Sequence, residues 1–423
     1  MAIEERPDAR PNRFSAALLR PFSSLHGNRE FSALLLSNIA FFGGMWTLTF
    51  ILGWMVFAQT GSEILVAAFT TVRLLPLLLG PLSGAISDRM DRRRLLMIAC
   101  GVAIVAAVGL AALTTAGLGS FGVLTAGGLA LGLAHSPSQP ARAALVAGKV
   151  PAEQLSNANA LNALAMNTTL MLGPAVGGLL VSAFGTATAL WIGSLWFVLS
   201  LIALRGVTGG YRPPEVPHSS IWRMLGEGFL AIARLRVVLA VLLITVAVNF
   251  LIWSIHQGFM PVFAQSMRLD AAGLGLLLTA FGVGGIVGSL VIAALGDFPW
   301  KGAVFVCGIA GMSVCWILFA LAPTTLIATG AFILAGLVSS VFGVLQNTLM
   351  LSATPPALQG RAMGLQELAI GAQPIAALAI GAAAQSIGIA ATTVISASLL
   401  MLFLAVMALS VPALMRYHGT PGA

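Results

Sequence analysis

Long apolar stretches, separated by short polar segments, constrain this chain more than any other feature of its sequence. Of its 423 residues, 58% are hydrophobic and only 8% are charged, whereas a soluble domain carries about a quarter charged residues. The mean hydropathy is +0.99, which excludes soluble and disordered chains because so much apolar surface cannot stay in water. The sequence therefore predicts an all-α protein that crosses a lipid bilayer several times, with about 20 apolar residues per crossing.

The apolar stretches divide into two sets of six predicted transmembrane helices. The first set covers residues 31–58, 63–87, 95–117, 120–142, 157–182 and 186–205. The second set covers residues 238–264, 271–296, 302–322, 325–350, 361–386 and 388–415. The predicted organisation is a cytoplasmic segment 1–30, an N-terminal six-helix bundle 31–206, a cytoplasmic linker 207–237, a C-terminal six-helix bundle 238–416 and a cytoplasmic tail 417–423. Between Ile221 and Leu235, apolar residues at helical spacing predict an amphipathic helix on the membrane surface.

The positive charges predict the orientation of these helices. Of the 21 Lys and Arg residues, all except Arg73 and Arg268 fall in the termini, the central linker or alternate loops. By the positive-inside rule we expect a multi-pass protein of the bacterial inner membrane with both termini in the cytoplasm. This placement explains the net charge of +8 without any nucleic-acid partner. The three cysteines lie in apolar stretches and indicate no disulfide framework.

The two predicted bundles resemble each other in sequence. Asn38 in the first helix corresponds to Asn249 in the seventh, and Gly178 and Gly185 correspond to Gly381 and Gly388. Two six-helix repeats are the simplest account, and chance similarity between apolar helices is the alternative. Many secondary transporters consist of such repeats and bind their substrate near the membrane midplane, where the repeats meet.

Polar side chains are unevenly distributed among the predicted helices. Apart from Arg205 at the end of the sixth, the third, sixth, ninth and twelfth helices contain no Asn, Gln, His or charged residue, as expected if these helices are peripheral and the others surround a cavity. The residues that we select as cavity or substrate candidates are Asn38, Trp46, Arg73, Gln139, Asn159, Asn162, Asn249, His256 and Gln346. For any single amide, hydrogen bonding between helices is an equally good interpretation.

Two charged residues lie within the predicted helices away from their ends, where a charge is a functional hypothesis by default. Arg73 lies roughly 22 Å from the cytoplasmic end of its helix, and Glu367 lies about 9 Å from the same side. We therefore expect no direct pairing between them. Glu367 is the first candidate for a proton-coupling group and His135 is the second; structural hydrogen bonding is the alternative for Arg73 and Glu367.

The segment that follows the second helix has the sequence Gly84-Ala85-Ile86-Ser87-Asp88-Arg89-Met90-Asp91-Arg92-Arg93. Asp88 can face the positive N-terminus of a neighbouring helix, and the arginines can anchor the turn at the anionic inner leaflet. This spacing resembles the signature loop of the major facilitator superfamily, with Asp91 in place of the usual second glycine. The resemblance implies a gating loop in which Asp88 latches one of two alternating states, while Gly84 permits close helix approach. It assigns the supporting charges to Arg89, Arg92 and Arg93.

The fifth helix carries Gly173, Pro174, Gly177 and Gly178, which resemble the end of the motif of drug/proton antiporters in that superfamily. Thr169 stands where the family often has a further glycine, and a Pro-kinked packing face is the alternative interpretation. Three further runs resemble the enterobactin-exporter-like branch: Arg73-Leu74-Leu75-Pro76, Pro140-Ala141-Arg142 and Gly360-Arg361-Ala362. That resemblance implies export driven by proton exchange, although we find no acidic residue in the first helix and expect no deep arginine in the fourth.

The expected function is secondary active transport by alternating access, with export of a small amphiphilic drug, siderophore or metabolite in exchange for protons. An importer of the same fold and a non-transporting receptor or scaffold are the alternatives. We expect no enzyme, because His135 with Ser136 or Ser138 lacks an orienting acid at a suitable spacing. We also expect no cofactor and no metal, and a monomer whose partners are the substrate, protons and the lipid bilayer.

Overall fold

The computed structural model describes residues 28–79, 90–151, 154–209, 232–295, 298–355 and 358–418. Within these ranges the regular structure is helical, with no strand. The predicted amphipathic helix of the linker lies outside the described residues except for residues 232–235, and most of the predicted cytoplasmic segment 1–30 lies outside them as well.

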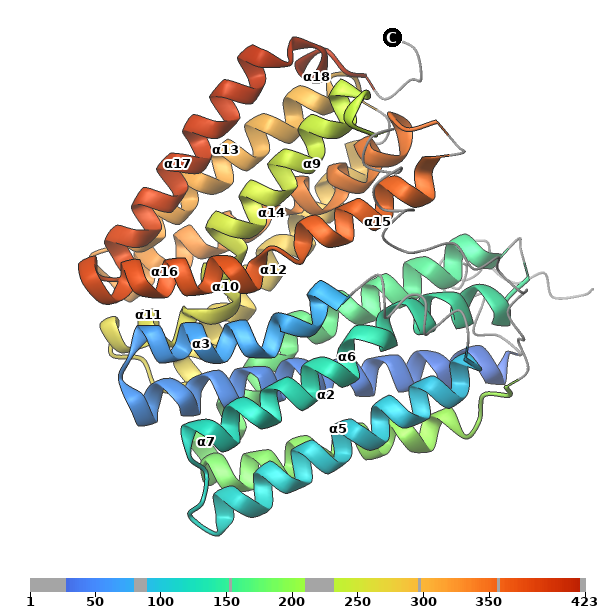
Figure 1. The fold of residues 1–423 in the computed structure, drawn as a ribbon, viewed down its shortest axis with the longest axis vertical. Coiled ribbons are helices and arrows are strands. Elements are labelled where there is room, and N and C mark those ends of the chain that lie inside the picture. The colour runs from blue at the N-terminus through green and yellow to red at the C-terminus, as the bar shows by residue number, and fades with distance from the viewer. Residues whose placement is uncertain are drawn as a thin grey trace, which may run out of the picture.

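The first half of the chain forms a bundle of long helices, drawn blue to green in Figure 1. These are α2 (Arg29–Thr60), α3 (Glu63–Leu74) followed by the 3₁₀-helix η2 (Leu75–Leu79), α5 (Arg92–Thr115), α6 (Phe121–Lys149) and α7 (Leu155–Leu204). Asn28 caps α2, because its side chain accepts a hydrogen bond from the Phe31 amide. Helix α6 continues seven residues beyond the predicted end at Arg142, so this arginine lies inside the helix rather than in a turn.

The second half forms the other bundle, drawn yellow to red. Its elements are α9 (Arg236–Val248), the π-helix η4 (Asn249–Trp253), α10 (Ser254–Gly258), α11 (Met260–Ser266), α12 (Ala271–Leu295), α13 (Lys301–Ala320), α14 (Thr325–Ser352), α15 (Gln359–Ile370), α16 (Gln373–Ile387), α17 (Ile389–Ser410) and α18 (Pro412–Met415). The predicted helices 238–264 and 361–386 are each interrupted. The first contains the π-helix, and the second breaks at Gly371 and Ala372, between α15 and α16.

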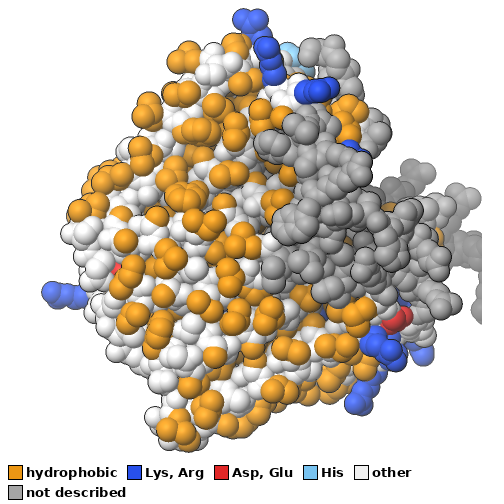
Figure 2. Space-filling model, in the orientation of Figure 1, with side chains coloured by type: hydrophobic (Ala, Val, Ile, Leu, Met, Phe, Trp, Pro, Cys, Tyr) orange, Lys and Arg blue, Asp and Glu red, His pale blue; other side chains and the backbone are white. Residues whose placement is uncertain are grey.

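Nine helical segments in the described part of the chain are long and apolar enough to cross a membrane. In this number α7 is one segment, although Gly185 interrupts it with φ 77° and ψ 168°. Helices α3 and α6 are not among the nine. Twelve crossings therefore require α7 to cross twice and α3 and α6 to cross as well, and that number stays a prediction. Hydrophobic side chains are spread over the described part of the face shown in Figure 2, and the Lys and Arg side chains lie at its margins, as expected for a lipid-facing surface.

The two halves contain the same internal hydrogen bond at equivalent positions. The Asn38 side chain on α2 donates from Nδ2 to Asn162 Oδ1 on α7 at 2.6 Å. In the second half, Gln373 on α16 donates from Nε2 to Asn249 Oδ1 on η4 at 2.7 Å. Each pair is separated by 124 residues along the chain. Gly185 and Gly388 also have matching left-handed backbone angles, with φ 77° and φ 82°. The internal repeat noted in the sequence thus has a structural counterpart.

The halves pack against each other through two helix crossings. In Figure 1, α16 lies along α3 at the left, while α15 continues away from α6 towards the right. At the α3–α16 crossing, Ser62 donates to Gln385 and Thr71 donates to the Pro374 carbonyl oxygen at 2.9 Å. At the α7–α12 crossing, Ser182 donates to Asp270 at 3.3 Å. Ser62 lies just beyond the C-terminal end of α2, whereas Asn28 lies at the N-terminal end of that helix. These contacts therefore close the end of the molecule where α2 ends.

Candidate functional site

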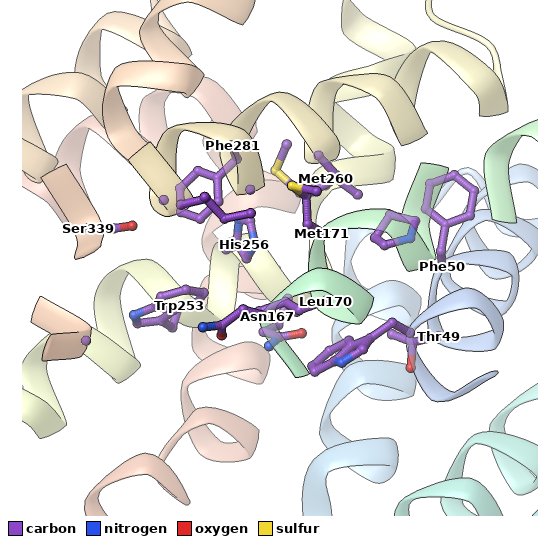
Figure 3. Close-up of a pocket in the computed structure, with 18 of the residues that line it drawn as sticks. Thr49, Phe50, Asn167, Leu170, Met171, Trp253, His256, Met260, Phe281 and Ser339 are labelled. Carbon is purple, nitrogen blue, oxygen red and sulfur yellow. The ribbon is translucent and has the colours of Figure 1, made fainter. Parts of the chain in front are cut away.

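A cavity of about 670 Å³ lies between the two halves. Its walls come from α2, α3 and the first part of α7 on one side, and from η4, α10, α11, α12 and α14 on the other. Figure 3 shows the facing side chains, including Asn167 from α7 and His256 and Phe281 from the second half. Since both halves supply walls, a rearrangement of the halves would change access to this space.

One wall of the cavity carries a buried cation. Arg73 is 8% exposed, and its Nη1 donates to Thr49 Oγ1 at 3.4 Å. Its Nε and Nη2 atoms have no hydrogen-bond partner among the described residues. No Asp or Glu is among the lining residues that the structure describes. An uncompensated guanidinium in a low-dielectric wall is unfavourable unless a bound group or water supplies acceptors.

The opposite wall is aromatic. The His256 ring lies 4.5 Å from the Phe281 ring and 5.1 Å from the Trp253 ring, measured between centroids. Trp316 and Phe332 pack behind His256 at 6.1 and 5.9 Å. The His256 Nδ1 atom is buried and has no hydrogen-bond partner among the described residues. This cluster therefore presents ring surfaces to the cavity and holds an imidazole rigidly within them.

Of the nine sequence candidates for the cavity, Trp46, Arg73 and His256 line it. The other six lie elsewhere, in two hydrogen-bonded groups or on exposed surface: Asn38, Gln139, Asn159, Asn162, Asn249 and Gln346. Gln139 and Asn159 are exposed on α6 and α7. Among the described residues, none that lines the cavity comes from α5, α13, α17 or the part of α7 beyond Gly185, as predicted for peripheral helices. Helices α6, α15 and α16, which were expected around the cavity, supply no described lining residue either.

A buried arginine inside the first bundle was missed in the sequence. Arg142 is 1% exposed, and its Nη1 donates to Asn38 Oδ1 at 2.5 Å and to Ser37 Oγ at 3.0 Å. Its guanidinium lies 4.4 Å from the centre of the Phe41 ring. This arginine therefore lies in the interior of the first bundle, seven residues before the end of α6. The signal was present, because Arg142 follows His135 by seven residues and so lies on the same helix face.

The second bundle has a polar group at the equivalent place. Asn249 accepts from Gln373 and donates from Nδ2 to the Thr245 carbonyl oxygen at 2.9 Å. Ser254 donates to the Asn249 carbonyl oxygen, which the π-helix leaves without its usual α-helical partner. Gln346 donates to Thr245 Oγ1 at 2.9 Å. Asn249 and Gln346 thus join the helices of this bundle to each other, beside the cavity rather than in its wall.

The glycines of the fifth-helix motif lie at helix contacts. Gly173 packs against Trp46, and Gly177 packs against Phe50, so both face α2 within the first half. A Cβ on Gly178 would overlap the Ala271 carbonyl oxygen of α12 in the second half. Pro174 lines the cavity. The motif therefore lies where the first half, the second half and the cavity meet.

Neither proton-coupling candidate lines the cavity. His135 is half-buried on α6 and meets the Phe42 ring edge-on, with 5.8 Å between centroids. Glu367 is exposed on α15. The neighbouring residue Gln366 is buried and donates from Nε2 to Asn347 Oδ1 at 2.7 Å, and Asn347 lines the cavity.

The predicted gating loop is described only at its end. Gly84, Asp88 and Arg89 lie outside the described residues. Asp91 caps α5, since its Oδ1 accepts from the Arg94 amide at 2.8 Å. Arg92 donates to the Ala144 carbonyl oxygen at 3.4 Å and Arg93 donates to the Leu204 carbonyl oxygen at 3.2 Å. These two arginines therefore hold the start of α5 against α6 and against the end of α7.

Comparison with known families decides what kind of protein this is. The Major Facilitator Superfamily model matches residues 34–372 and 242–421. The chain belongs to the major facilitator superfamily. Among curated relatives, the enterobactin exporter EntS of Shigella boydii serotype 18 is 28% identical over 287 residues, which are 67% of each chain. EntS of Escherichia coli O1:K1 is 27% identical over the same length and the same shares.

Solved structures support the same fold. One is a bacterial homologue of the human lysosomal transporter Spinster, in an inward-facing and unoccupied conformation. It has a TM-score of 0.71 at 12% identity, over 92% of this chain and 99% of that chain. Another is a peptide transporter POT in complex with sulfate, with a TM-score of 0.75 at 13% identity, over 92% of this chain and 95% of that chain. At this identity the likeness concerns the fold alone.

Proposed function

We propose that this protein is a secondary active transporter that exports a small amphiphilic molecule by alternating access. The observation that carries the proposal is the cavity whose walls are divided between two internally equivalent halves. A site at such an interface changes sides when one half rocks against the other. The mixture of ring surfaces with a few polar groups suits an amphiphilic molecule.

The proposed resting state opens towards the cytoplasm. The α3–α16 and α7–α12 crossings close the end of the molecule remote from Asn28. If the chain has both termini in the cytoplasm, as its positive charges predict, the closed end faces outwards. An exporter needs such a state to load its substrate from the inside.

Proton exchange is the proposed driving force. Glu367 is the first candidate for the coupling group, because it is a carboxylate next to Gln366, whose side chain donates to the cavity-lining Asn347. His135 is the second candidate. Asp88, with Gly84, Arg89, Arg92 and Arg93, is proposed to latch one of the two states. A monomer in the bacterial inner membrane is the proposed working form.

The proposed cargo is of the siderophore kind, since the curated relatives are named enterobactin exporters. The test uses Escherichia coli cells that make enterobactin but lack their own exporter. We expect the wild-type chain to raise the amount of enterobactin in the medium and to lower the amount retained in the cells. Gly178→Leu is the matched inactive control, because its side chain would collide with α12. Secretion equal to that of cells without the chain, despite normal insertion, would contradict siderophore export.

A further inference from the structure

The charge of the cavity wall carries an inference about the substrate. Among the lining residues that the structure describes, Arg73 is the one side chain with a full charge at neutral pH. A lone positive charge in a wall of low dielectric attracts an anion and repels a cation strongly, since water screens it little. The wall therefore discriminates between substrates by the sign of their charge.

Most N–H donors of the Arg73 guanidinium have no acceptor among the described residues. A guanidinium has five N–H donors, and the one described bond of this group is the 3.4 Å contact from Nη1 to the neutral Thr49 hydroxyl. Nε and Nη2 have no partner, and no described carboxylate forms an ion pair with Arg73. By contrast, Arg142 has hydrogen bonds to Asn38 and Ser37 and a ring contact with Phe41. Arg73 thus has one long hydrogen bond and two nitrogens without a described partner, whereas in Arg142 Nε alone lacks one.

The rest of the wall indicates what else the ligand carries. Trp46, Phe50 and Phe69 line the cavity from the first half, and Trp253, His256 and Phe281 line it from the second. Figure 3 shows His256, Phe281 and Trp253 grouped on one side of the space and Phe50 on the other. Flat, rigid side chains of this kind bind the faces and edges of other rings.

We propose that the cavity selects anions that carry an aromatic ring, with the anionic group at Arg73 and the ring against the aromatic wall of the second half. This inference rests on the proposed function and names the substrate class of the same cavity. A ligand held in this way contacts both halves at once. The anionic group of the ligand also neutralises the positive charge of Arg73 in the cavity wall.

The test measures binding of four small probes to the purified full-length protein in lipid nanodiscs. The probes are 2-naphthoate, 2-naphthamide, 2-naphthylmethylammonium and cyclohexanecarboxylate, which separate the anionic charge from the ring. We expect 2-naphthoate to bind at least about tenfold more tightly than each of the other three, as one charge-assisted hydrogen bond supplies. Equal or tighter binding of the ammonium probe would overturn the proposal, and so would failure of 2-naphthoate to bind at all.

Variants at position 73 test whether the anionic group of the probe binds to Arg73. Arg73→Gln should weaken 2-naphthoate binding about tenfold and leave 2-naphthamide unchanged, while Arg73→Lys should retain part of the preference for the anion. Arg416→Gln, which removes an exposed charge outside the cavity, is the control and should change nothing. Unchanged anion binding in folded Arg73→Gln would overturn the assignment.

Transport measurements distinguish an error in the proposed substrate class from an error in the proposed function. Vesicles that contain the wild-type protein should export an aromatic anion and ignore cationic dyes. Export of cationic dyes instead would leave the transporter standing and overturn the substrate class. Tight binding of 2-naphthoate without transport of any aromatic anion would leave the substrate class standing and overturn the proposed function.

Discussion

At the scale of single residues, the two buried arginines have opposite surroundings and therefore different expected roles. Arg142 lies among acceptors that α2 supplies, so its charge is compensated inside the first bundle. Arg73 lies in the cavity wall with two unpaired nitrogens. A charge compensated by its own bundle stabilises that bundle, while a charge without a partner is available to a ligand.

Arg142→Gln should destabilise the protein. The shorter neutral side chain would leave the Asn38 and Ser37 oxygens without their charged donor, at a cost of about 3 kcal/mol in the free energy of unfolding. We expect the melting temperature in detergent to fall by roughly 3–4 °C. Arg416→Gln, at an exposed position, is the control for loss of one charge. Equal melting temperatures of wild-type protein and Arg142→Gln would contradict the structural role.

Glu367→Gln tests the proposed coupling group. If Glu367 carries the exchanged proton, the amide should abolish transport driven by a pH gradient and leave substrate exchange at equal pH intact. Both rates can be measured in inverted membrane vesicles with the cargo that the secretion experiment identifies. Glu63→Gln, in the first turn of α3, is the matched carboxylate control. Unchanged dependence on the pH gradient in Glu367→Gln would reject this residue as the coupling group.

At the scale of elements, the α7–α12 crossing decides how closely the halves approach. Gly178 faces the Ala271 carbonyl oxygen, and Gly275 faces the Pro174 carbonyl oxygen, so the two helices approach backbone to backbone. Small residues allow such close approach between membrane helices. The α3–α16 crossing repeats this arrangement with Gly381 against Ala67. These crossings form the closed end and must separate when access alternates.

Gly178→Ala should shift the protein away from the state closed at this end, because the added methyl group cannot fit beside Ala271. Spin labels at Ser62 and Gln385, in a chain with its native cysteines replaced by serine, report the separation of the halves. We expect a longer distance in Gly178→Ala than in the unmodified chain. Gly101→Ala is the control, since a Cβ at Gly101 meets nothing within 4 Å. Identical distance distributions would show that this contact does not hold the end closed.

Hydropathy predicts most of these elements because lipid requires long apolar helices, but it does not predict their interruptions. The π-helix at Asn249 and the break at Gly371 depend on hydrogen bonds to other helices, which no local pattern encodes. Arg142 was placed at the predicted end of the fourth helix, so its burial inside α6 was not anticipated. Helix α12 was expected beside the cavity, but no candidate residue was selected on it, because it contributes glycines, apolar side chains and Ser289 to the wall. In contrast, Arg73 and His256 were found, because charge and imidazole are rare in apolar helices.

At the scale of the whole molecule, two equivalent halves enclose one cavity and both supply aromatic side chains, while the buried cation belongs to the first half. The amide pairs Asn38–Asn162 and Asn249–Gln373 hold equivalent helices together within each half. Each half can therefore move as a unit, while Arg73 and the ring cluster around His256 lie on opposite units. A substrate that bridges them would favour the states in which both walls are close.

Accessibility of the cavity from the two sides of the membrane tests alternating access most directly. Asn167, an exposed lining residue, is changed to Cys in a chain with Cys100, Cys307 and Cys315 replaced by Ser. A membrane-impermeant maleimide is then added to spheroplasts or to inside-out vesicles. In a second form, Ser62→Cys and Gln385→Cys are joined by a disulfide across the closed end.

We expect the unlocked protein to be labelled from both sides, and the locked protein to be labelled from the cytoplasmic side alone. Labelling of the unlocked protein from one side only, or labelling of the locked protein from the outside, would contradict alternating access around this cavity.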